Sequence, residues 1–378
     1  RTGCVWPACP CIRSAEGDGA SQEGVGYYQH TVGHGRRSTS ARAYLGAPRD
    51  WRRHPRLTVC TGTQATRILF DRTSAEPRAT GVEFIQAGSL QRAHASREVI
   101  VCAGAIHSPQ LLQVSGIGDS VHLRALGIDA VAHSPEVGLN LQDHIQARVR
   151  YVLNRPLGLN ALYHDKLRLG WQALRYALTR TGRLAAPPIR SGMFCRSTPD
   201  QPRPDLQFHF IEFSTDGMGR PPHREPAFWS SVCVLRPKSR GHVRITAPEV
   251  TTPPEILGNF LSHPDDAALA VQGVHLARLH AAQPALAALI REEADPGPGT
   301  TTDDRILDWI RRTAVTVYHP AGTCRMGADA TSVVDPQLRV RGVQGLRVAD
   351  VSIMPTLVSG NTNVPAMMIG EKAASMMS

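Results

Sequence analysis

The sequence predicts a protein of two domains, one α/β and one α+β. A continuous apolar run over 98–104 leads through a glycine into a helical segment, as a buried strand of a parallel sheet does. From about residue 142 to residue 332, strands with one apolar face are followed by helices, which favours an antiparallel sheet covered on one side. A chain of 378 residues is long enough to bury two such cores. Because the α/β pattern resumes after the second domain, we expect the α/β domain to be discontinuous.

The elements of the first part follow from local patterns. Alternation predicts strands at 57–60, 66–70 and 79–85. After the apolar run, Ser108 is the expected cap and Pro109 the expected start of a short helix. Three cysteines fall in apolar runs and are expected to be reduced core residues: Cys60, Cys102 and Cys233.

In the second part, 167–178 has the spacing of an amphipathic helix. The remaining elements expected there are strands at 206–213, 231–235 and 242–245, and helices at 264–282 and 303–312, the last with Thr302 as cap.

The last sixty residues carry the chemistry. His319 stands between a tyrosine and a proline, and imidazole is the only common side chain with an unperturbed pKa near neutrality. The apolar run 346–349 predicts a buried strand that ends at Asp350, and strand carboxyl ends hold ligands in open α/β sheets. A polar turn at 361–363 then opens a helix with a proline near its first turn. The free N–H groups of such a helix start suit an electron-rich ring or a phosphate.

Composition excludes some classes of protein. The net charge is +10, but the arginines are spread along the chain and aromatic residues make up only 5%, so we expect no nucleic-acid partner. No apolar run reaches the roughly 18 to 20 residues of a membrane span, and no secretory leader stands at the start. We therefore expect a cytoplasmic protein, with a peripheral position at the inner membrane left open. The spacing of Cys4, Cys9 and Cys11 is poor for zinc, and we expect no metal.

Several blocks resemble, in order, the glucose–methanol–choline (GMC) oxidoreductases, flavoenzymes that oxidise alcohols, and most closely the choline dehydrogenase-like members. The resemblance covers about 19–376, and its blocks are 22–29, 35–45, 104–118, 138–144, 235–241, 318–327, 346–350 and 359–365. It implies a partial FAD-binding domain over 19–141 that returns at 333–378, a substrate domain over 142–332 and an unplaced leader over 1–18.

The resemblance also implies roles for single residues. His319 would be the base that takes the hydroxyl proton while hydride passes to flavin N5, and Asn361 would hold the alcohol oxygen. The expected FAD-binding residues are Ala65 at the adenine, Asp350 at the ribityl-phosphate region, Thr362 at the pyrimidine edge, Ala349 as a close neighbour of the flavin, and Asn363. Asn363 is also the expected helix cap. The implied reaction oxidises a primary alcohol to an aldehyde, with a quinone or another carrier as the electron acceptor.

One family element is not found in the sequence. No G-x-G-x-x-G turn follows a strand, so the pyrophosphate loop is missing, and we expect the chain by itself to bind FAD weakly. Two alternatives to the oxidoreductase stay open: a cofactor-poor, non-catalytic fragment, and a flavin-containing lyase of the same fold. Cys324, His107, His144 and His209 are interpreted as structural residues.

Overall fold

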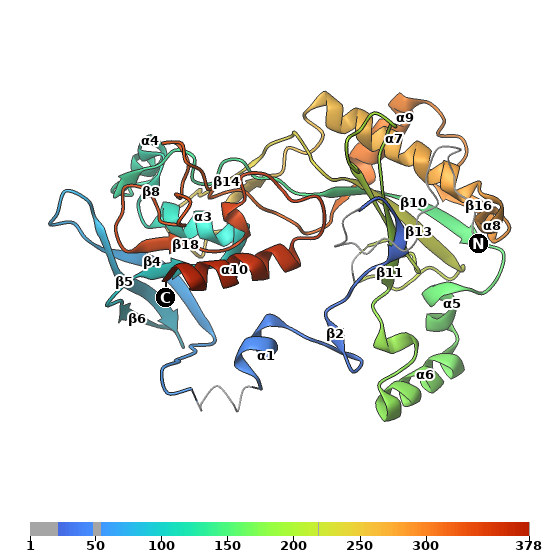
Figure 1. Cartoon of the computed structure of the whole chain (residues 1–378), viewed down its shortest axis with the longest axis horizontal. Helices are drawn as coiled ribbons and strands as arrows, with labels where there is room; N and C mark the ends of the chain where they lie inside the picture. The colour runs from blue at the N-terminus through green and yellow to red at the C-terminus, as the bar shows by residue number, and fades with distance from the viewer. Residues whose placement is uncertain (1–21, 48–53, 218, 378) are drawn as a thin grey trace. The chain divides into compact units, whose positions relative to one another are not determined.

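The structure, a computed structural model, describes residues 22–47, 54–217 and 219–377. They form two compact units (Figure 1). Unit 1 contains the described residues before 48 together with 145–235 and 264–316. Unit 2 contains the described residues from 54 to 144 together with 236–263 and 317–377. The predicted leader and the cysteines at 4, 9 and 11 lie outside the described residues.

Unit 1 is built on one antiparallel sheet of seven strands. Its order is β1-β11-β12-β13-β10-β16, and β17 pairs with the start of β10. The strands are β1 (Gly24–Tyr27), β10 (Ile145–Leu153), β11 (Ile189–Cys195), β12 (Leu206–Ile211), β13 (Ala227–Val234), β16 (Ile290–Asp295) and β17 (Val315–Thr316).

Two helices cover one face of this sheet, α7 (Pro264–Ala281) and α9 (Asp303–Thr313) (Figure 1). Gly273 of α7 lies so close to the sheet that a Cβ there would stand 2.7 Å from the Val232 side chain. Thr302 caps α9 by accepting the N–H of Arg305 at 3.4 Å. The predicted antiparallel sheet covered by helices is therefore confirmed.

The rest of unit 1 consists of short elements, among which α6 is the longest. They are β2 (Val32–Gly33), β3 (Arg36–Arg37), α1 (Ser40–Leu45), α5 (Gly158–His164), α6 (Lys166–Thr179), the 3-10 turn η1 (Arg183–Ala185) and α8 (Pro284–Ala287). The amphipathic helix predicted at 167–178 corresponds to α6.

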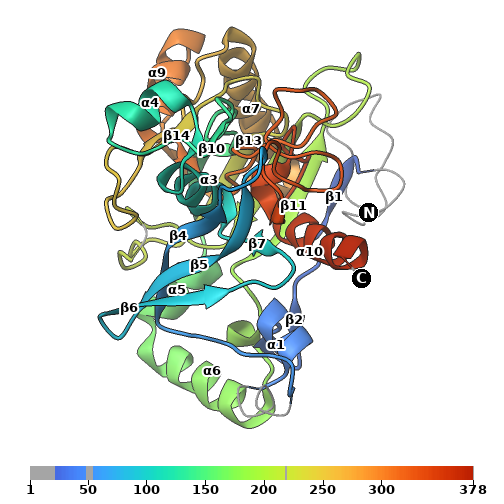
Figure 2. The same ribbon diagram turned by 90° about the vertical axis from the view of Figure 1, so that its left-hand side faces the viewer.

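Unit 2 contains the α/β part of the chain. Strand β18 (Leu346–Val348) pairs in parallel with β7 (Val99–Val101), although almost 250 residues separate them in the sequence. Helix α3 (Gly104–Val114) follows β7, and α10 (Asn363–Met377) ends the described chain. Figure 2 shows the three-stranded antiparallel sheet of this unit, β4 (Thr63–Asp71), β5 (Arg78–Gln86) and β6 (Ser89–His94).

Smaller elements complete unit 2. They are β8 (Ile117–Gly118), α4 (Ser120–Ala125), β9 (Ala132–His133), β14 (His242–Arg244), β15 (Glu255–Leu257) and the 3-10 turn η2 (Val351–Ile353). The core of the unit includes both α3 and β18, since Leu112 of α3 and Val348 of β18 are fully buried in it. No helix of the described chain has the length and apolar character that crossing a bilayer requires.

Three local predictions need correction. Residues 57–60 form no strand and Cys60 is exposed, because none of the described strands pairs with this segment. Cys102 is also exposed, since β7 ends one residue before it, whereas Cys233 is buried as expected. Helix α3 begins at Gly104 rather than at Pro109, so Pro109 and Ser108, the expected cap, both lie inside the helix.

Candidate active site

His319 lies between two side chains that contact its two ring nitrogens. Its Nδ1 is 3.0 Å from Nδ1 of His144, and its Nε2 is 3.2 Å from the amide Nδ2 of Asn361. An amide NH₂ group only donates, so Nε2 of His319 is the acceptor in the second contact. The hydrogen of the neutral ring is then on Nδ1, where it is donated to His144. In this hydrogen-bond network the basic nitrogen of His319 is Nε2, the one that faces Asn361.

The backbone around His319 is fixed by the same short segment that carries His144. The carboxylate of Asp143 accepts the backbone N–H of His319 at 2.8 Å, and the N–H of Val317 donates to the carbonyl of His144 at 2.8 Å. Between them, Tyr318 has a φ of 62°, a left-handed conformation that is rare for a bulky residue. Such strain persists only where the surroundings hold it, and it is concentrated at functional sites.

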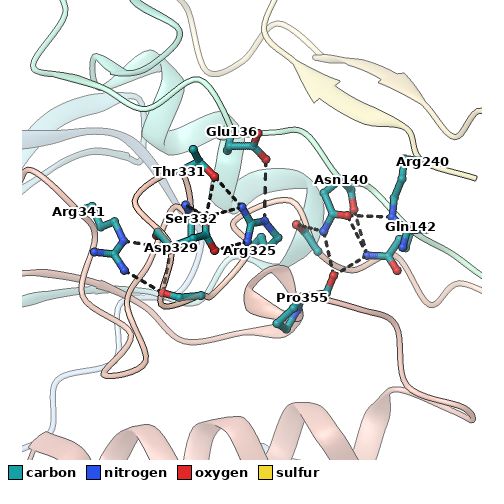
Figure 3. A network of polar contacts seen from close by, with 12 residues as sticks. Glu136, Asn140, Gln142, Arg240, Arg325, Asp329, Thr331, Ser332, Arg341 and Pro355 are labelled. Carbon is teal, nitrogen blue, oxygen red and sulfur yellow. Dashed lines mark hydrogen bonds and ion pairs between the residues drawn. The ribbon is translucent and has the colours of Figure 1, made fainter. Parts of the chain in front are cut away.

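The loop after His319 is packed closely against the segment 138–142. A Cβ at Gly322, whose φ is 93°, would stand 2.6 Å from the carbonyl oxygen of Asn140, so only glycine fits there. Gln142 and Ala321 exchange two backbone hydrogen bonds of 3.0 and 2.9 Å. Figure 3 shows the side-chain part of this contact, in which Asn140 and Gln142 both donate to the carbonyl of Pro355. The loop that leads to Asn361 is thereby tied to the loop that carries His319.

A second polar cluster lies beside this one, around Arg325. Its guanidinium donates to both carboxylate oxygens of Asp329, at 2.9 and 3.1 Å, and lies 3.9 Å from the carboxylate of Glu136 (Figure 3). The guanidinium of Arg325 holds the pKa of the exposed Asp329 carboxyl well below its usual range. Arg341 closes the cluster through the hydroxyl of Ser332. Because Arg325 is already paired, it supports the loop rather than activating the neighbouring cysteine.

Thr323, in the loop that follows His319, makes a hydrogen bond that Pro109 prevents inside α3. A proline inside a helix has no N–H to donate to the carbonyl four residues earlier, which here is that of Ala105. The hydroxyl of Thr323 donates to that carbonyl at 2.6 Å, and Thr323 is fully buried. The loop of His319 therefore satisfies an acceptor that α3 leaves unpaired.

Asp350 has a structural role that the sequence did not reveal. Its carboxylate accepts the backbone N–H of Gly104 at 2.9 Å, the hydroxyl of Ser108 at 2.5 Å and the N–H of Ser352 at 2.7 Å. Asp350 thus joins the end of β18 to the start of α3. Ala349, just before it, donates its N–H to the carbonyl of Val101 at 2.9 Å.

The helix that was expected to face a cofactor begins one residue earlier than predicted, because the expected cap, Asn363, already belongs to it. Asn363 is the first residue of α10, so Thr362 occupies the position before the helix, where it is 9% exposed. Its carbonyl accepts the N–H of Ala366 at 2.9 Å. No acidic residue lies in the first turn, which leaves the positive end of this helix without a carboxylate of its own.

The predicted site residues therefore fall into separate groups. His319 and Asn361 are in contact, and Thr362 and Asn363 follow Asn361 directly. Ala65 lies apart in β4, where its carbonyl accepts the side-chain amide of Gln64 at 3.1 Å.

Other candidate groups behave as structural residues. Burial raises the pKa of the Cys324 thiol, and its backbone N–H donates to Ser352, so a reactive thiolate is not expected there. His107 contacts Gln110 within α3 at 2.9 Å. Over the described ranges no cluster of histidine, cysteine or acidic residues has the arrangement of a metal site.

Sequence reasoning missed two residues of the site, Asp143 and His144. Interpreting His144 as structural was incomplete, because this fully buried ring contacts the ring of His319 directly. The available signals were their adjacency just before a strand and their place in the block 138–144. Nothing in them indicated a partner 175 residues away.

Comparison with known proteins gives the family. Models described as GMC oxidoreductase match residues 4–146 and 237–370. An alcohol dehydrogenase [acceptor] of Pseudomonas putida is 41% identical over 95% of this chain, and the mitochondrial choline dehydrogenase of Homo sapiens is 40% identical over 95% of it. The chain spans 64% and 59% of the lengths of these two relatives.

Solved structures agree on the fold. Pyridoxine 4-oxidase from Mesorbium loti has a TM-score of 0.79 at 26% identity, over 94% of this chain and 64% of that one. An FAD-dependent oxidoreductase from Chaetomium thermophilum has a TM-score of 0.84 at 23% identity, over 95% of this chain and 68% of that one. The two family models, which together match well over half of the sequence, show that the chain belongs to the GMC oxidoreductase family.

Proposed function

We propose that this chain carries the base of an FAD-dependent enzyme that oxidises a primary alcohol to an aldehyde. The observation that supports this most directly is the basic Nε2 of His319, held next to the amide of Asn361. The lone pair of this nitrogen accepts the Asn361 amide in the structure, and it can accept a hydroxyl proton near neutral pH once an alcohol enters between the two side chains. The neighbouring amide can hold the same hydroxyl oxygen, so the proton and its acceptor are aligned before transfer.

His144 completes this arrangement as a positioning residue. By accepting the Nδ1 hydrogen of His319, it keeps the neutral ring in the tautomer whose Nε2 is basic. Once Nε2 has taken a proton, the same contact stabilises the imidazolium, because Nδ1–H then donates from a charged ring. Asp143 holds the backbone of the base, so both residues of the pair act through His319.

The residues around the site fit the flavin end of FAD. The start of α10 offers backbone N–H groups and the positive end of a helix dipole, with no acidic residue in the first turn to oppose an electron-rich ring. Thr362 would hold the pyrimidine edge there, with Asn363 beside it at the start of the helix. Asp350 would lie at the ribityl-phosphate region, Ala349 would be a close neighbour of the flavin, and Ala65 would meet the adenine through its backbone. When bound, FAD supplies the oxidant that accepts the hydride of the alcohol.

The three hydrogen bonds to Asp350 restrict the contacts that its carboxylate could make with FAD. Its carboxylate is engaged by Gly104, Ser108 and Ser352, so a cofactor contact there would use a remaining lone pair or the backbone. We infer that its main effect on the cofactor is indirect, through the placement of α3 against β18.

The names of the relatives support an alcohol as substrate without fixing which one. They include an alcohol dehydrogenase [acceptor] and an oxygen-dependent choline dehydrogenase of Paraburkholderia xenovorans, so they also differ in electron acceptor. For this protein we propose a quinone or another carrier rather than oxygen. Reoxidation of the reduced protein by a soluble quinone and by air, compared in one experiment, tests that choice.

Anaerobic mixing of the flavin-loaded protein with a panel of alcohols tests the reaction. We expect the 450 nm flavin band to bleach and an aldehyde to appear in equal amount. Cleavage of a cyanohydrin without bleaching would support the lyase alternative. A protein that takes up no flavin would support the non-catalytic alternative.

A further inference from the structure

Helix α6 of unit 1 presents an apolar stripe to solvent. Its members are spaced by four, three and four residues, which places them within about 60° of arc on one face of a helix. They are Leu167, Trp171, Leu174 and Leu178, with 88%, 64%, 50% and 76% of their surfaces exposed. Large apolar side chains gathered in this way mark an interaction surface, whereas single exposed ones are ordinary.

The opposite face of α6 is the one that contacts the rest of unit 1. The hydroxyl of Tyr176 donates to the carbonyl of Gly35 at 2.8 Å, and the side chain of Gln172 accepts the backbone N–H of Arg183 at 3.1 Å. A surface helix of a globular protein normally buries its apolar stripe and exposes its polar face. Here the orientation is reversed, and Figures 1 and 2 show α6 beyond the end of the unit 1 sheet.

The charges around the stripe are predominantly positive. Between residues 165 and 183 there are five basic residues and one acidic residue. The acidic one, Asp165, already caps α6 and lies 3.1 Å from the guanidinium of Arg168. Arg168 and Arg175 each follow a member of the stripe by one position, so they flank it on one side, and Lys166 precedes the stripe and flanks it on the other.

An apolar stripe with a central tryptophan and basic flanks is the pattern of a helix that lies in the surface of an anionic bilayer. We propose that α6 docks this protein on an anionic membrane surface. The stripe enters the boundary between headgroups and acyl chains, while the flanking side chains reach back to the lipid phosphates. A second copy of the chain fits this face less well, because docking two copies through α6 would bring their positive flanks together. This inference does not depend on the alcohol assignment.

Sedimentation with lipid vesicles tests the proposal. The flavin-loaded protein should bind phosphatidylcholine vesicles that contain phosphatidylglycerol and should bind pure phosphatidylcholine much less, with affinity falling as salt rises. The double variant Trp171→Ser with Leu178→Ser should weaken partition by about tenfold or more, because it removes two inserted side chains. Arg175→Glu should weaken binding to the anionic vesicles specifically. The control, Val121→Ser, changes a side chain that is 67% exposed in α4 and should leave binding unchanged.

Depth-dependent quenching gives a readout on the unmodified protein. Brominated lipids should quench part of the tryptophan emission of the parent protein. That quenched part should be absent from the Trp171→Phe variant. Three results would overturn the proposal: no binding to anionic vesicles, equal binding by the double variant and the parent, or a change in oligomeric state on the double substitution with vesicle binding unaltered.

Discussion

The rings of His144 and His319 meet edge to face, with their Nδ1 atoms 3.0 Å apart and their planes at 84°. One of the two nitrogens donates and the other accepts, so the pair decides which nitrogen of His319 is free to act as a base. The contact thus connects a motif at residues 138–144 with the histidine near the end of the chain.

Replacing His144 by phenylalanine should slow flavin reduction by about tenfold to a hundredfold, since the ring of His319 loses the acceptor that fixes its tautomer. Substrate affinity should change little, because His144 acts through His319. His144→Gln should restore much of the rate, since its carbonyl can accept the same hydrogen. Stopped-flow reduction measures the rate, and ¹⁵N shifts of the His319 ring report the tautomer. An unchanged tautomer in His144→Phe would refute the positioning role, with His107→Gln as the control.

Thr323→Val should lower the free energy of unfolding by about 1–3 kcal/mol, because the buried carbonyl of Ala105 then has no donor. Thr313→Val is a matched control. It removes the hydroxyl of an exposed residue near the end of α9, which donates to the carbonyl of Trp309. Its effect should stay within about 0.5 kcal/mol. Urea unfolding of both variants measures the difference. Equal losses would mean that the Thr323 bond does not compensate for Pro109.

His280 should make unit 1 sensitive to acid. Burial lowers the pKa of His280 to about 4, so between pH 6.5 and 4 the unfolded chain binds a proton that the folded chain does not. Stability should therefore fall as the pH decreases through this window, by up to about 3 kcal/mol from this residue. At pH 7 the ring is neutral in the folded state and mostly neutral in the unfolded state, so its effect on stability is small. His280→Leu should flatten the dependence of Tm on pH between 6.5 and 4. If the variant keeps the parent's slope, the acid sensitivity comes from other groups.

Much of the fold could be predicted because its signals are local. The period of α6, the Thr302 cap of α9 and the apolar run of β18 each depend on a few neighbouring residues. The start of α3 was misplaced because a proline normally begins a helix. The carbonyl that Pro109 cannot pair inside α3 accepts a hydrogen bond from Thr323, more than 200 residues away.

The candidate site was predictable only in part, for the same reason. His319 and Asn361 stand in a recognisable motif, but the partner of His319 comes from another segment of unit 2. The orientation of α6 was also unpredictable, since an amphipathic pattern does not show which face is buried. The exposure of the stripe, together with the contacts that Tyr176 and Gln172 make on the opposite face, establishes that the apolar side faces outward.

The central claim is that His319 accepts the hydroxyl proton, and the rate of anaerobic flavin reduction by an alcohol tests it most directly. His319→Ala should slow this rate by about 10² to 10⁴ at saturating alcohol, with flavin content unchanged. Asn361→Ala, which removes only the positioning amide, should cost less. A His319→Ala protein that reduces its flavin at the parent's rate would contradict the account.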